Sequence, residues 1–145
     1  MKLVEDGSDA PEDVAKFKLR LSHWEAKARY ALGDYKKALE LADEQVQALD
    51  AEYPSLVMKE KYNEGLPALE DANPALINDI NAPDYVIYMY LKFRLLQART
   101  NKAIGMNHIA HEQCNSIIMF RRQFMHMTPA KWWISACKAA EVQSA

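Results

Sequence analysis

The chain has 145 residues, of which 50% are hydrophobic and 26% are charged, a length and balance that suit one domain with a single core. The net charge of −2 argues against a general nucleic-acid binder, because such a protein needs a large cationic surface. The first residues lack the apolar stretch of a signal peptide, and no window reaches the roughly 18 to 20 apolar residues of a membrane span. We therefore expect a soluble, cytoplasmic protein.

The N-terminal third is expected to begin with a flexible arm, residues 1–10, followed by a helix from Pro11 to Leu32. Asp9 can cap this helix, and Pro11 fits its first turn. Its apolar residues recur at alternating steps of three and four, which is heptad spacing. They are Val14, Phe17, Leu21, Trp24, Ala28 and Ala31. We expect this stripe to be covered within the chain.

A second helix is predicted from Tyr35 to Tyr53, after a turn in which Gly33 takes the left-handed conformation and Asp34 caps the new helix. Its apolar stripe also has heptad spacing and consists of Tyr35, Leu39, Ala42, Val46, Leu49 and Tyr53. Two matched stripes joined by a tight turn predict an antiparallel helical hairpin.

The middle of the chain changes character after Pro54. We expect a short helix over residues 55–62 and an irregular connector, residues 63–83, in which each of two prolines opens one helical turn. A third helix should then run from Asp84 to about Lys102. Its first part, DYVIYMYLKFRLL, is too apolar for a helix with one dry side, so we expect it to be the central helix of a bundle.

The last third predicts a second hairpin. A turn around Gly105 leads to a fourth helix from Asn107 to Met127, and a short helix should follow from Ala130 to Ala140, with a frayed end over residues 141–145. The whole chain, 1–145, is thus expected to be a single all-α domain, a bundle of two antiparallel helical hairpins plus a short C-terminal helix.

The sequence contains little that indicates catalysis. Cys114 and Cys137 are expected to be free, partly buried thiols in a reducing compartment, with a single disulfide between them as the alternative. His108 and His111 lie with Cys114 at i, i+3 and i+6, so a shared metal ligand set is an alternative, although a structural zinc site usually needs a fourth residue. No phosphate loop, nucleophile elbow or paired-carboxylate motif occurs. We expect a protein that is not an enzyme and that holds no metal or cofactor, with a metal- or thiol-dependent enzyme as the alternative.

Arginine and aromatic residues gather in the second half of the chain, and both types are enriched as anchors of protein interfaces. The predicted partner interface consists of Tyr85, Tyr88, Tyr90, Arg94, Phe120, Arg121, Arg122, Phe124, Trp132 and Trp133. Two alternatives remain open. The arginines could lie over a helical core, or they could form a local basic patch that contacts nucleic acid.

One short segment resembles a known repeat. ALGDYKKALELA, residues 31–42, resembles the turn and second helix of a tetratricopeptide unit, with Gly33, Asp34, Tyr35 and Ala38 at the usual loop and small-residue positions. The resemblance implies a helical module that binds other proteins.

A second resemblance covers residues 80–127. A Pro-Asp-Tyr start, an apolar helix from Tyr85 to Leu96, a polar turn and a helix ending in Phe120 to Phe124 together resemble the helical pair of phage head-to-tail connector proteins, also called adaptors. This resemblance implies a ring-forming, non-enzymatic assembly protein that is incorporated into a virion. Our leading expectation is therefore an assembly protein that forms homo-oligomers or docks on protein partners, with a tetratricopeptide-like interaction module as the alternative.

Overall fold

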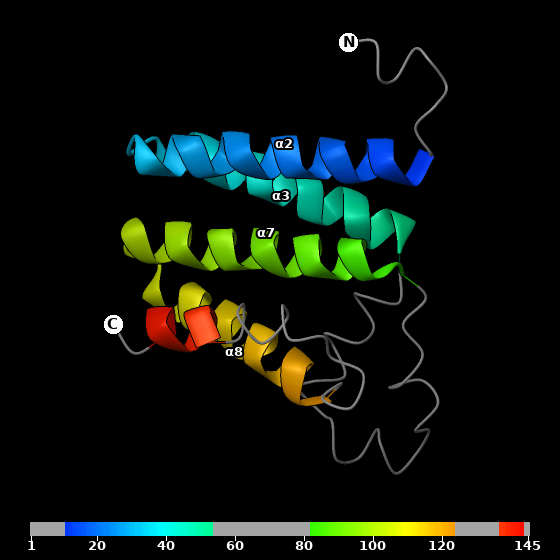
Figure 1. The fold of residues 1–145 in the computed structure, drawn as a ribbon. Helices are drawn as coiled ribbons and strands as arrows, with labels where there is room; N and C mark the ends of the chain where they lie inside the picture. Colours follow the sequence, from blue (N-terminus) through cyan, green and yellow to red (C-terminus); the bar gives the residue numbers. More distant parts are fainter. Residues whose placement is uncertain (1–10, 54–81, 124–136, 144–145) are drawn as a thin grey trace.

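A computed structural model describes residues 11–53, 82–123 and 137–143, and every regular element in these ranges is helical (Figure 1). The elements are α2 (Pro11–Ala31), α3 (Tyr35–Glu52), α7 (Asp84–Ala103), α8 (Asn107–Gln123) and a short helical segment, residues 137–143. The prediction of an all-α helical bundle is confirmed. The bounds of α2, α3 and α7 agree with the predicted ones within one residue at each end.

The two hairpin turns have the same construction. In the first, the amide of Gly33 donates to the carbonyl of Tyr30, and that of Asp34 donates to Arg29. In the second, Gly105 and Met106 bond in the same pattern to Lys102 and Asn101. This is the Schellman arrangement, which needs a left-handed residue, and the φ angles of Gly33 and Gly105 are +82° and +87°. Asp34 also caps α3 by accepting from the Lys37 amide at 3.4 Å.

Helix α7 is the centre of the bundle, as DYVIYMYLKFRLL predicts. It packs against α2, α3 and α8, and Figure 1 shows it between the first hairpin and α8. Twelve of its 20 residues are buried. Tyr90 and Phe93 are among the largest fully buried side chains of the described residues. A helix that is apolar on several faces is thus covered on several faces.

Helix α3 faces the bundle with the stripe that its sequence predicts. Ala42, Val46 and Leu49 are buried, and Ala38 joins them. Tyr53 and Leu41 pack against the same core from its border. The heptad pattern therefore located the covered face of this helix correctly.

The corresponding prediction for α2 is wrong. Phe17, Leu21 and Trp24 are 41%, 45% and 59% exposed, and Ala28 and Ala31 are exposed too. The covered face carries instead Leu19, His23, Ala26 and Tyr30. These residues follow the predicted stripe by two positions, which is about 200° around an α-helix. The apolar stripe therefore points away from the bundle.

The C-terminal segment also differs from its prediction. Residues 137–143 are helical, so residues 141–143 do not fray, and Ala139 is fully buried against the core. Lys102 stabilises this segment by donating from Nζ to the carbonyl of Val142. The predicted N-terminal arm, the short helix over 55–62, most of the connector, and residues 124–136 lie outside the described residues.

Candidate functional site

The predicted partner interface is divided by the structure. Tyr90 is only 2% exposed and lies in the core cluster, so its ring is not available to a partner. Tyr85 and Tyr88 are half-buried and pack against that core from its border. Phe120, Arg121 and Arg122 continue α8. The side chains of those three residues, and all of Phe124, Trp132 and Trp133, lie outside what the structure describes.

Arg94 has a role inside the bundle. Its Nη1 donates to Oε1 of Gln97 at 3.1 Å, and Nε2 of Gln97 donates to Oδ1 of Asp43 at 2.7 Å. The amide thus links a cation on α7 to a carboxylate on α3. Arg94 is half-buried, and this link orients the two hairpins relative to each other.

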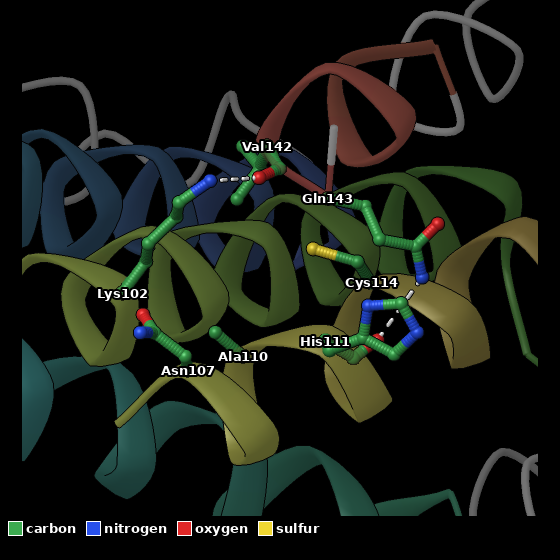
Figure 2. Close-up of a pocket in the computed structure, with 7 residues that line it drawn as sticks. All are labelled: Lys102, Asn107, Ala110, His111, Cys114, Val142 and Gln143. Carbon is green, nitrogen blue, oxygen red and sulfur yellow. Dashed lines mark hydrogen bonds between the residues drawn. The ribbon is translucent and has the colours of Figure 1, made fainter. Parts of the chain in front are cut away.

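A cavity of about 240 Å³ lies where the end of α7, the start of α8 and the C-terminal segment meet. Figure 2 shows Lys102 reaching Val142 on one side of it, and Gln143 donating to the carbonyl of His111 at 3.2 Å on the other. These two bonds hold the C-terminal segment over α7 and α8. Cys114 lines the cavity between them.

The surroundings of Cys114 are not those of a nucleophile. Both cysteines are free. Both were predicted to be partly buried, but Cys114 is buried and Cys137 is exposed. Burial raises the pKa of the Cys114 thiol, and the charges of Lys102 and Arg99 offset part of that rise. A nucleophilic cysteine needs a lowered pKa, so Cys114 is suited to packing.

His111 lines the same cavity as Cys114, but His108, His111 and Cys114 do not form a metal-binding group. His108 is largely exposed, and its Nε2 lies 3.2 Å from Oε1 of Glu112. Within residues 11–53, 82–123 and 137–143, no three His, Cys, Asp or Glu side chains are placed to hold a metal ion. The metal alternative therefore has no geometric support in the part of the chain that is described.

A second cavity, of about 300 Å³, lies between α2, α7 and the C-terminal segment. Lys27 lines it from α2, Lys92 and Arg99 from α7, and Lys138 from the C-terminal segment. The sequence shows Lys92 and Arg99 seven residues apart on one helix. It gives no local signal that would bring Lys27 and Lys138 to them, because that depends on how three elements pack.

His23 forms part of the wall of this cavity. It is 7% exposed, and its ring meets the edge of Phe93 with a centroid distance of 5.4 Å and an interplanar angle of 73°. Burial is the largest cause that lowers the pKa of His23 from 6.5 to about 4, and the charges of Lys92, Lys27 and Arg99 contribute the rest of that shift. The imidazole is therefore neutral at physiological pH.

The exposed stripe of α2, which we define as Val14, Phe17, Leu21, Trp24, Ala28 and Ala31, is flanked by charges; Val14 at its start is half-buried, and the other five residues are exposed. In heptad terms Val14, Leu21 and Ala28 are a positions, and Phe17, Trp24 and Ala31 are d positions.

The g positions before the stripe are Asp13, Arg20 and Lys27, and the e positions after it are Lys18, Glu25 and Leu32. Asp13, Lys18, Arg20 and Glu25 make no ion pair with other described residues. Their charges are therefore available to a partner helix.

No protein-family model, curated protein or solved structure matches the chain. Among the helices of the described ranges, none has the length and apolarity needed to cross a bilayer.

Proposed function

We propose that this chain is an assembly protein, not an enzyme, and that two copies pair through the exposed stripe of α2. The observation that carries the proposal is the exposure of Phe17, Leu21 and Trp24 at heptad spacing on a helix whose opposite face is already buried. Soluble monomers rarely leave large apolar side chains in a contiguous row, and such rows mark interaction surfaces.

The charges beside the stripe favour a parallel, in-register pair. In such a pair each g residue faces the e residue five positions later on the other helix. Asp13 then faces Lys18, and Arg20 faces Glu25, so all four charged contacts of the symmetric pair are attractive. An antiparallel arrangement would bring Arg20 towards Lys27 and is less favourable.

The position of α2 leaves room for such a partner. Its stripe lies about 200° around the helix from its buried face, and Figure 1 shows α2 along one edge of the bundle. A second α2 can therefore approach without displacing α3 or α7. Paired apolar stripes of this length are the packing unit of coiled coils.

The first test replaces Leu21 or Trp24 by Glu and measures mass by sedimentation equilibrium. The wild-type chain should be a dimer, and each variant should weaken pairing by about 2–4 kcal/mol, since aromatic and aliphatic anchors dominate interfaces. The matched control is Ile109→Glu, which puts the same charge on an exposed apolar residue of α8 and should leave pairing unchanged. A wild-type monomer, or equal weakening by the control, would contradict the proposal.

A charge exchange tests the parallel register. Arg20→Glu places like charges opposite Glu25 in both symmetric contacts and should weaken pairing by about 1–2 kcal/mol. Adding Glu25→Arg restores the opposite signs and should recover most of the loss. If the double variant pairs no better than the single one, the helices are not parallel and in register.

The resemblance of residues 80–127 to head-to-tail connectors suggests a finer form of the same proposal, a subunit of a viral ring. Native mass spectrometry distinguishes a simple dimer from a ring. A dimer supports α2 pairing alone, and a ring-sized species supports a connector. The aromatic and arginine residues of the second half would then supply a further contact between subunits.

A tetratricopeptide-like module stays the alternative. It is supported by the hairpin turn at Gly33, and it predicts that Lys37→Glu abolishes binding of a peptide partner.

A further inference from the structure

The cavity between α2, α7 and the C-terminal segment collects positive charge without a compensating acid. Its lining includes Lys27, Lys92, Arg99 and Lys138, and no Asp or Glu. Three of the four, Lys27, Arg99 and Lys138, make no hydrogen bond or ion pair with other described residues. Four like charges around about 300 Å³ repel one another, and an anion among them would remove that cost.

The remaining cation has only a weak partner. The Lys92 ammonium lies 5.2 Å from the centroid of the Tyr88 ring, a cation–π contact that leaves its charge uncompensated. The neutral state of His23 fits the same field, because protonating it would add a fifth positive charge. Residues of α2, α7 and the C-terminal segment therefore all contribute to the positive charge of the cavity.

Apart from the neutral His23, the rest of the wall is largely apolar. Leu95, Leu96 and Tyr30 line the cavity beside the four cations. A ligand that filled the space would meet cationic nitrogens on one part of its surface and aliphatic or aromatic carbon on another. Small-molecule sites commonly combine an apolar lining with a few polar groups that fix orientation.

We propose that this cavity binds a small phosphorylated organic molecule, with its phosphate among Lys27, Lys92, Arg99 and Lys138 and its organic part against Leu95 and Leu96. Arginine forms a fork that matches phosphate oxygens, and lysine binds phosphate as a point charge. The volume lies at the lower end of the range for small-molecule sites and exceeds what inorganic phosphate needs. A nucleic-acid strand would require a groove that follows its backbone, which a bounded cavity does not offer.

The pairing of α2 does not neutralise the cations of this site, although Ala31 of the stripe also lines the cavity. Lys27 is a g residue, but the position that faces it in a parallel pair is Leu32, so pairing gives Lys27 no counter-charge. The monomeric Leu21→Glu variant should therefore bind the ligand as the wild-type chain does. The two proposals can fail separately.

Phenyl phosphate is the probe, and titration of the full chain followed by NMR is the measurement. We expect saturable shifts at residues of α2, α7 and 137–143, with binding about tenfold tighter than that of inorganic phosphate because the ring is buried. Arg99→Gln and Lys138→Gln should each weaken binding by about tenfold. Neither should unfold the chain, since each relieves repulsion. Lys16→Gln, which removes an exposed lysine of α2 outside the cavity, should bind unchanged.

His23 reports whether the probe lies in the cavity. An anion beside Lys92, Lys27 and Arg99 counteracts their charge, so the pKa of His23 should rise when phenyl phosphate binds. Absence of saturable shifts would overturn the proposal. So would equal binding by Arg99→Gln and Lys16→Gln, or a bound state in which the titration of His23 is unchanged.

Discussion

Helices α2 and α7 are nearly equal in length, 21 and 20 residues, yet they use their apolar residues in opposite ways. In α7 the apolar residues extend around the helix, and three neighbouring helices cover them. In α2 they form one ordered stripe, and that stripe faces outwards. Regular heptad spacing thus shows that a face is suited to a helical partner, and it does not show that the partner belongs to the same chain.

Small side chains help to join α2 to the bundle, beside the larger Leu19, His23 and Tyr30. Ala26 on α2 is fully buried, as are Ala38 and Ala42 on α3. Side chains as short as alanine allow two helix backbones to approach closely, and close approach supplies many dispersion contacts.

The largest expected effect contrasts a phenylalanine of each helix. Phe93→Ala removes a fully buried ring from α7 and should lower the free energy of unfolding by about 3–5 kcal/mol. Phe17→Ala removes a 41% exposed ring from α2 and should cost less than about 1 kcal/mol in the monomer. Urea unfolding at protein concentrations below the dimerisation range measures both. Similar costs would mean that the stripe of α2 is covered within its own chain.

A second expected effect concerns the one buried titratable residue of α2 whose pKa is strongly shifted. The pKa of His23 is near 6.5 in the unfolded chain and about 4 in the folded one. Between these values the unfolded chain binds a proton that the folded chain does not, so stability falls as pH is lowered through this window. The loss should reach about 2–3 kcal/mol at pH 4 relative to pH 7.

Urea unfolding at a series of pH values measures that loss. His23→Gln should remove most of the pH dependence. His108→Gln, at an exposed histidine of α8, should leave it in place. If both variants retain the wild-type profile, another group causes the pH dependence, and the contact of His23 with α7 is not what excludes its proton.

The smallest expected effect concerns the two glycine turns, which have the same construction in both hairpins. Gly33→Ala and Gly105→Ala each force a side chain into the left-handed region, at φ angles of +82° and +87°. Nothing lies within 4 Å of the added Cβ in either case, so the cost is that of the backbone alone, about 1 kcal/mol. Thermal unfolding of the two variants should therefore show matching losses. A clear difference would mean that the two turns are constrained differently by their surroundings.

The sequence predicted the elements that local rules govern. Turn chemistry located Gly33, Asp34 and Gly105, and the density of apolar residues identified α7 as central. The same rules could not orient α2, because its buried face includes His23 and Ala26, which do not stand out as a core stripe.

The cationic cavity was beyond sequence reasoning for a different reason. Lys27 and Lys138 are more than a hundred residues apart, and they meet only because α2 and the C-terminal segment both pack beside α7. Tyr90 is an error of the opposite kind. Its residue type predicted a partner interface, but the structure buries its ring in the core.

The central position of α7 also imposes an order of events during synthesis. The first hairpin leaves the ribosome before the helix that covers Ala42, Val46 and Leu49 has been made. Residues 54 to 103 must still be added, which takes roughly 3 to 10 seconds at about 5–20 residues per second. Throughout that interval the nascent hairpin exposes apolar side chains on both α2 and α3. We expect this interval, rather than the finished fold, to be the stage at which the chain is most open to aggregation and to chaperones.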